Sequence, residues 1–288
     1  MPKVLVLGAR GQLGTELVRE SAARGYPTVG LGREELDIAR PDLIEQAIRL
    51  HRPDWLINAA AYNQVDVAER EPLAAMQTNG LAVRQMALCC RDSGATLLHF
   101  STDHVFDGKK AAPYTEEDVP RPLSAYGISK LAGELYAQAY LERCLVVRTA
   151  GVYGPAGRGT NRGNFVELML RLAAEGRAIR VVEDFYASPT YAPALAARSI
   201  DLLEKARFGV YHIGGAATIS WYAWALLIFR EAGVRAEITP TNEREYPTPA
   251  RRPKYSVLSN AKMEAAGVAP MPPLEHCIRD YLKSSGRA

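Results

Sequence analysis

The first half of the chain alternates short apolar runs with segments whose apolar positions recur every three to four residues. The predicted strands are Lys3–Leu7, Thr28–Leu31, Trp55–Asn58, Thr96–Ser101 and Cys144–Arg148. The predicted helices are Gln12–Arg24, Leu43–Leu50, Ala74–Arg91 and Ser124–Leu141. Strands that are apolar throughout are typical of a parallel sheet covered on both faces. We therefore predict an α/β fold with a Rossmann-like, doubly wound parallel sheet.

After about Arg148 the alternation weakens. Gly, Arg and polar residues dominate Gly151–Gly163, which we predict to be a loop, and the proline-rich segment Pro240–Pro253 should be irregular and exposed. The further predicted elements are the helices Phe165–Glu175 and Tyr191–Lys205 and the strands Ile179–Val182 and Gly209–Ile213. We divide the chain into residues 1–148 and a smaller C-terminal lobe of residues 149–288, and expect some later elements to return to the first sheet.

Composition narrows the classes of function. The 288 residues are 48% hydrophobic, yet no apolar run is long enough for a membrane-spanning helix, and the N-terminus does not resemble a signal peptide. A net charge of +3 without a Lys/Arg block argues against a nucleic-acid partner but suits an anionic small molecule. The four cysteines show no Cys-x-x-Cys spacing, so we expect reduced thiols in the cytoplasm.

A glycine-rich turn stands at the first strand–helix junction. The spacing is Gly-x-x-Gly-x-x-Gly, which permits a tight turn and close approach of backbone N–H groups to a pyrophosphate at a helix N-terminus. Glycine triplets also occur in ordinary turns, but this position favours a dinucleotide site in residues 1–148. The residues expected at the cofactor are Gly8, Arg10, Gly11, Gln12, Leu13 and Gly14.

The end of the second strand bears on the choice of cofactor. Arg33 stands where an acidic residue would bind the ribose 2′-OH of NAD, so we predict NADPH, with NADH as the alternative. A surface arginine beside two glutamates is the competing interpretation. Asp37 and Ile38 are expected to flank the adenine. The small residues after the third strand would let the cofactor lie against the backbone, or serve helix–sheet packing; they are Ala59, Ala60 and Ala61, followed by Tyr62.

Tyr126 and Lys130 lie four residues apart, on one face of a predicted helix. An ammonium one turn from a phenol should lower the pKa of the tyrosine, and the phenol could pass a proton to a carbonyl oxygen. Lys130 could also hold the nicotinamide ribose. A tyrosine and a lysine at this spacing are common by chance, but their occurrence in a chain with the glycine turn favours a catalytic pair. Thr102, at the end of the fourth strand, is predicted to orient the carbonyl, with Ser101 as the alternative.

Further motifs extend this pattern along most of the chain. They include Ser101-Thr102-Asp103 with Val105-Phe106-Asp107-Gly108, Val152-Tyr153-Gly154, Gly163-Asn164-Phe165, Ser188-Pro189-Thr190, and Tyr246-Pro247-Thr248 with Arg252-Pro253. With these motifs the chain resembles the extended short-chain dehydrogenase/reductase family, in particular its branch that reduces the C4 ketone of a dTDP-sugar in dTDP-L-rhamnose synthesis, with NADPH or NADH.

The resemblance implies roles for individual residues. It makes Thr102, Tyr126 and Lys130 catalytic and adds Asn79 to the cofactor site. It implies that residues 149–288 mainly bind a nucleotide-sugar substrate. The residues it places at the substrate, besides Thr102 and Tyr126, are Ser101, Asp103, His104, Val105, Gly151, Asn164 and Arg252. Arg252 would pair with a diphosphate, or be a plain surface arginine.

The chain departs from the family pattern around the substrate. His104 replaces a tyrosine, and would touch substrate or merely pack in its place. Ala150 and Gly151 replace a serine and a tryptophan, Phe185 replaces a glutamine, and Asn63 a threonine. Some members use Mg²⁺ at a dimer contact, which leaves a homodimer open, but no carboxylate cluster in the sequence supports a metal site.

Two other functions stay open at this point. A sugar-nucleotide epimerase or dehydratase could use the same scaffold, although dehydratases carry an Asp-Glu pair where this chain has Asp103-His104. A non-catalytic regulatory subunit of this fold is the third hypothesis. The intact pair of Tyr126 and Lys130 argues against it.

Overall fold

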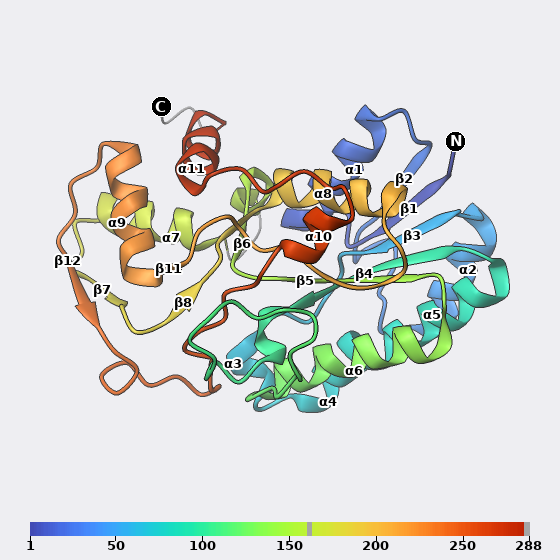
Figure 1. Cartoon of the computed structure of the whole chain (residues 1–288), viewed down its shortest axis with the longest axis horizontal. Coiled ribbons are helices and arrows are strands. Elements are labelled where there is room, and N and C mark those ends of the chain that lie inside the picture. Colours follow the sequence, from blue (N-terminus) through green and yellow to red (C-terminus); the bar gives the residue numbers. More distant parts are fainter. Residues whose placement is uncertain (160–162, 285–288) are drawn as a thin grey trace.

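A six-stranded parallel sheet forms the centre of the larger lobe in the computed structural model, which describes residues 1–159 and 163–284 (Figure 1). The strand order is β10-β5-β4-β3-β1-β2, and every neighbouring pair is parallel. The strands are β1 (Val4–Leu7), β2 (Thr28–Leu31), β3 (Trp55–Asn58), β4 (Thr96–Thr102), β5 (Cys144–Thr149) and β10 (Gly209–His212). The chain changes direction between β1 and β3, where such sheets bind ligands at the carboxyl ends of the strands.

Helices cover both faces of this sheet (Figure 1). One face packs against α2 (Pro41–His51), α5 (Ala82–Ser93) and α6 (Ala125–Tyr140), and the other against α1 (Gln12–Ala23) and α8 (Ala192–Lys205). Side chains of β1 alternate between the two cores, with Leu5 and Leu7 in one and Val4 and Val6 in the other. The predicted doubly wound α/β fold is confirmed.

The helix predicted as Ala74–Arg91 is interrupted. It consists of α4 (Pro72–Met76), a π-helical turn over Gln77–Leu81, and α5, which ends at Gly94 in the left-handed conformation. The π-turn contains the buried Asn79, whose side chain bonds outside the helix. Such turns are frequent at functional sites, and their hydrogen-bond shift leaves no periodic signal in the sequence.

The smaller lobe gathers around aromatic residues. Tyr153, Trp224 and Tyr281 are buried in its core. Its elements are α7 (Phe165–Ala174), α9 (Trp221–Ala232), α11 (Leu274–Lys283), and the strands β7 (Ile179–Val182) and β12 (Ile238–Thr241), which pair in parallel. Neither α9 nor α11 is among the helices predicted from the sequence. In α9 the apolar residues run almost without interruption, which hides the helical period.

The remaining elements are short. They are α3 (Val65–Ala68), the 3₁₀ turns Asp103–Val105 and Pro155–Gly159, β6 (Val152–Tyr153), β8 (Tyr186–Ala187), β9 (Thr190–Tyr191), β11 (Ile219–Ser220) and α10 (Ala261–Ala265). The segment predicted as a loop, Gly151–Gly163, therefore contains β6 and a 3₁₀ turn, and its residues 160–162 lie outside the described part of the chain. The domain boundary near Arg148 stays a prediction.

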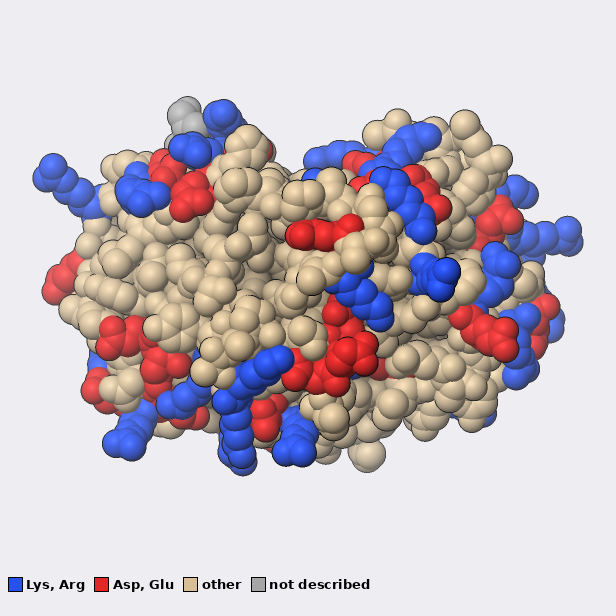
Figure 2. All heavy atoms as spheres, viewed as in Figure 1, with Lys and Arg blue, Asp and Glu red and all other residues tan. Residues whose placement is uncertain are grey.

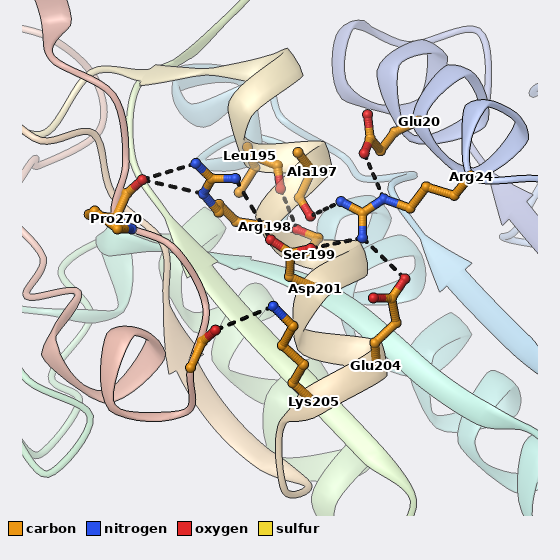
Figure 3. Close-up of polar contacts among 11 residues, drawn as sticks. Glu20, Arg24, Leu195, Ala197, Arg198, Ser199, Asp201, Glu204, Lys205 and Pro270 are labelled. Carbon is orange, nitrogen blue, oxygen red and sulfur yellow. Dashed lines mark hydrogen bonds and ion pairs between the residues drawn. The ribbon is translucent and has the colours of Figure 1, made fainter.

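A cluster of ions ties α8 to α1 (Figure 3). Arg24 at the end of α1 donates to Glu20, at 2.7 Å, to Asp201, at 2.8 Å, and to Glu204, at 3.1 Å. It also donates to the carbonyl oxygen of Ala197, at 3.1 Å. The Arg24 side chain is only 24% exposed, so these contacts are partly shielded from water.

The surface mixes charges of both signs, and the face seen in Figure 2 shows no block of basic side chains. Among the residues that the structure describes, no helix is long and apolar enough to cross a membrane.

We predict that Arg24→Ala lowers the free energy of unfolding by about 1–3 kcal/mol, because it removes the charged partner of the Ala197 carbonyl and leaves Asp201 only its longer ion pair with Arg198, at 3.7 Å. Arg49→Ala is the matched control, since Arg49 forms a single ion pair on an exposed helix surface and should cost about 0.5 kcal/mol or less. Urea unfolding of both variants gives the comparison. Equal losses would show that the Arg24 cluster adds nothing beyond a surface pair.

Candidate active site

The glycine turn brings the end of β1 against the loop after β3. Gly8 has φ +75°, and a Cβ there would lie 2.6 Å from the backbone nitrogen of Ala60. A Cβ on Gly14 would lie 2.1 Å from the carbonyl oxygen of Gly8. No side chain caps the N-terminus of α1, and its first turn holds no acidic residue. This helix end can therefore accept an anion at its backbone N–H groups.

The Gln12 side chain points to the smaller lobe. Its Nε2 donates to the Val152 carbonyl at 2.8 Å, and its Oε1 accepts from the Gly154 amide at 3.1 Å and from Asn164 at 3.0 Å. Asn164 also caps α7 by accepting from the Glu167 amide at 3.1 Å. Because the Gln12 side chain is bonded to the smaller lobe, only its backbone remains for the predicted contact with the cofactor. The Asn164 side chain joins the two lobes.

Two arginines lie at the carboxyl end of β2. Arg10 forms an ion pair with Glu35, and Glu35 also accepts from the Gly32 amide at 2.9 Å. The hydrogen bond from Arg10 lowers the pKa of Glu35 to about 2. The Arg33 side chain is 89% exposed and lies 3.8 Å from Asp37. Both guanidinium groups are accessible to a phosphate, and the pairing of Arg10 with Glu35 had no signal in the sequence.

Asn79 fixes the loop after β3. Its Oδ1 accepts from the Tyr62 amide and its Nδ2 donates to the Tyr62 carbonyl, both at 2.9 Å. Nδ2 also donates to Ser129 Oγ on α6 at 3.0 Å. Asn58, which is not among the predicted site residues, accepts from the Ala60 amide through its Oδ1 at 3.1 Å. Together these contacts hold the backbone of residues 59–62 beside the glycine turn.

Tyr126 reaches the end of β4 because α6 begins unusually close to it. Ser124 caps the helix by accepting from the Gly127 amide at 3.2 Å. A Cβ on Gly127 would lie 2.4 Å from the His104 carbonyl oxygen, so only glycine allows this approach. The Tyr126 phenol then lies close enough to the Thr102 hydroxyl for this hydroxyl to affect its pKa.

The pKa values of the pair differ from the sequence-based expectation. Burial raises the pKa of Tyr126 to about 12, although the neighbouring Thr102 hydroxyl opposes the shift. The expected lowering by Lys130 is wrong for this structure, because the Lys130 ammonium donates instead to the Phe100 carbonyl at 2.5 Å. Burial lowers the pKa of Lys130 to about 8. At neutral pH the phenol is protonated, which is the form that donates a proton.

Ser101 and Thr102 point to opposite faces of the sheet. The Ser101 hydroxyl donates to Glu134 on α6. Thr102 Oγ1 donates to Asp103 at 3.0 Å and accepts from the His104 amide at 3.2 Å. Val105 is fully buried against Phe106, Tyr114, Ala150 and Leu258. The geometry thus places Thr102 beside the phenol and gives Ser101 and Val105 supporting positions.

His104 lies edge-on to the Tyr126 ring, with 5.5 Å between ring centroids and an interplanar angle of 83°. Burial lowers the pKa of His104, so the imidazole is neutral at pH 7. Its Nδ1 is buried and has no hydrogen-bond partner among the described residues. This position supports both interpretations of His104, since the ring packs on the phenol and keeps an unused polar atom.

Arg252 is paired within the protein. Its guanidinium donates two bonds to Asp66 on α3, at 3.0 and 2.8 Å, and one to Thr248 at 2.6 Å. The late loop is thereby fastened across the two lobes, and contact with a diphosphate stays a prediction for Arg252. Gly151 has φ +51° and accepts from the Thr190 amide at 3.2 Å. Among residues 1–159 and 163–284, no group of His, Cys, Asp or Glu is arranged to hold a metal ion.

Comparison with known proteins agrees with this geometry. Spore coat polysaccharide biosynthesis protein SpsK of Bacillus subtilis is 38% identical over 288 residues, covering 100% of this chain and 99% of that protein. A dTDP-4-dehydrorhamnose reductase of Burkholderia thailandensis is 38% identical, covering 97% of this chain and 99% of its own length. The crystal structure of dTDP-4-dehydrorhamnose reductase from Bacillus anthracis, in complex with NADP, matches with a TM-score of 0.92 at 33% identity, covering 98% of this chain and 99% of that chain. The model of the family described as RmlD substrate binding domain matches residues 2–286, and the chain therefore belongs to this family.

Proposed function

We propose that this protein reduces the C4 ketone of dTDP-4-dehydro-β-L-rhamnose to give dTDP-L-rhamnose, with NADPH as reductant. The observation that carries the proposal is the contact of Tyr126 with Thr102, with Lys130 one helical turn further along α6. This proton-donating group stands at the same sheet edge as the glycine turn. The full-length relatives named for this reaction support the choice of substrate.

The residues present fit NADPH. A Cβ at Gly8 or Gly14 would meet backbone atoms within 3 Å, so the turn is built for close approach rather than for side chains. Its pyrophosphate would lie at the start of α1, near Gly11 and Leu13, and Arg10 and Arg33 would receive the 2′-phosphate. Asp37, Ile38, residues 59–62 and Asn79 would border the rest of the molecule. When bound, NADPH supplies the hydride.

The chain's own residues supply the proton and the orientation. Tyr126 donates its phenolic proton to the C4 oxygen, and the raised pKa of this phenol keeps it in the protonated form at neutral pH. Thr102 orients the same oxygen through its hydroxyl. Lys130 holds the nicotinamide ribose with its ammonium. We assign Asp103, His104 and Gly151 to the sugar, with Ser101, Val105, Asn164 and Arg252 supporting the site from their protein contacts.

The substrate also bears on where the protein acts and on its partners. We propose a cytoplasmic reaction of a small anionic molecule, without a nucleic-acid or membrane partner. A homodimer would be compatible with this site, in which every assigned residue comes from one chain. Mg²⁺ is not assigned a role.

The proposal is tested by NADPH oxidation with dTDP-4-dehydro-L-rhamnose as the acceptor. We expect one NADPH consumed for each sugar reduced. An epimerase would regenerate its cofactor and show no net consumption, and a regulatory subunit would bind NADPH without oxidising it. Either result, obtained with folded protein and across a panel of 4-keto nucleotide sugars, would refute the assignment.

Tyr126→Phe should lower kcat by roughly 10²–10⁴-fold while leaving NADPH affinity close to that of the parent, because only the acidic proton is removed. Tyr136→Phe, on the same helix, is the matched control and should keep full turnover. Steady-state kinetics together with fluorescence titration of NADPH give both quantities. Unimpaired turnover in Tyr126→Phe would remove this residue from the chemistry.

Arg33→Ala should weaken NADPH binding roughly tenfold and leave NADH binding nearly unchanged, because an exposed guanidinium–phosphate contact of about 1.4 kcal/mol is lost. The distant Arg49→Ala should change neither affinity. The ratio of the two dissociation constants is the measurement. If Arg33→Ala leaves the ratio unaltered, Arg10 becomes the remaining candidate for the 2′-phosphate.

A further inference from the structure

A row of buried charges continues from the catalytic pair into the protein. Tyr126, Lys130 and Glu134 follow each other at intervals of four residues on α6 and so share one face of the helix. Lys130 is 2% exposed and Glu134 is fully buried. Glu134 is not a part of the chemistry described above, and burying a carboxylate is costly unless it is paired.

The partners of Glu134 come from two strands. Arg148 on β5 binds the carboxylate with three hydrogen bonds of 2.7–3.1 Å, and Ser101 on β4 donates a further one. Ser101 and Arg148 are register partners in the parallel sheet, which is why both side chains meet the same carboxylate. Arg148 in turn lies 3.5 Å from Nε2 of His212. The carboxylate is therefore held in one place.

Arg148 is paired directly with a carboxylate, whereas the buried ammonium of Lys130 has no such partner at contact distance among the described residues. Its ammonium is buried, and its hydrogen bond goes to the neutral carbonyl of Phe100. Within residues 1–159 and 163–284, Lys130 forms no ion pair with a carboxylate at contact distance. Glu134, one turn along the same helix face, is the charge that opposes the effect of burial on the pKa of Lys130.

We propose that Glu134 is a positioning residue for the catalytic lysine: its buried carboxylate keeps Lys130 charged and, through Ser101 and Arg148, fixes α6 against the sheet. The signs alternate along the row, from the ammonium of Lys130 to the carboxylate of Glu134 and the guanidinium of Arg148. This inference rests on the proposed function, because it assumes that Lys130 holds the cofactor.

Tyr126 and His99, which lie around Lys130, do not titrate in the same range. Burial raises the pKa of Tyr126 to about 12 and holds the pKa of His99, on β4, well below its ordinary value. Asp103, at the end of β4, and Arg148, on β5, are further charged side chains in this region. A loss of NADPH affinity with a midpoint near pH 8 therefore reports the deprotonation of Lys130.

The test follows NADPH affinity of the full-length protein from about pH 6 to about pH 9.5, by fluorescence titration. In the parent, affinity should fall with a midpoint near pH 8. Glu134→Gln should move this midpoint lower by roughly one pH unit, and Arg148→Gln should move it higher, because it removes the positive charge that offsets the carboxylate. Glu134→Asp should keep the parent midpoint more closely.

Opposite shifts separate an electrostatic role from a structural one, since loss of packing alone would weaken both variants without moving the midpoint. If Glu134→Gln does not fold, as judged by circular dichroism, Arg148→Gln decides. An unmoved or lowered midpoint in Arg148→Gln overturns the inference, as does a parent whose affinity is flat with pH. Sugar turnover is measured separately. If both midpoint shifts are observed but no sugar is reduced, the proposed function is refuted and the role of Glu134 is not.

Discussion

The site depends on how closely α6 approaches the turn after β4. At Gly127 the helix backbone lies so near the His104 carbonyl that a methyl group would be 2.4 Å from its oxygen. Gly133 makes a similar approach six residues later, where a Cβ would lie 2.2 Å from the carbonyl oxygen of Asn79. These two glycines set the depth of the helix, and the depth decides whether a phenol on its first turn can reach a hydroxyl on the neighbouring strand.

Much of the larger lobe could be predicted from the sequence because its strands are short and apolar. The bounds of β1, β2 and β3 agree with the prediction to within one residue. The π-turn around Asn79 and the apolar helix α9 could not be predicted, since the first depends on a side chain that bonds across the fold and the second has no polar face. The periodicity of apolar residues along the chain contains no sign of a long-range hydrogen bond, and it cannot be detected in a helix that is apolar all round.

The candidate site also contains features that could be predicted from local sequence and features that could not. The glycine turn and the pair Tyr126 and Lys130 could be identified because their spacing is local. The directions of Ser101 and Gln12 could not, because each depends on a partner distant in the sequence, Glu134 in one case and the second lobe in the other. The rise in the pKa of Tyr126 also escaped prediction, because a spacing of four residues says nothing about burial or about where the lysine ammonium points.

The spacing of Tyr126, Lys130 and Glu134 on one uninterrupted helix has a consequence for how this region can vary. One residue inserted between the first and the last would turn everything after it by about 100° around the helix axis. Either Lys130 would turn away from β4, or Glu134 would no longer reach Arg148. A change in a neighbouring loop could not restore both contacts. Length variation among relatives should therefore fall in the loops before Ser124 and after Tyr140, while the register of α6 itself stays constant.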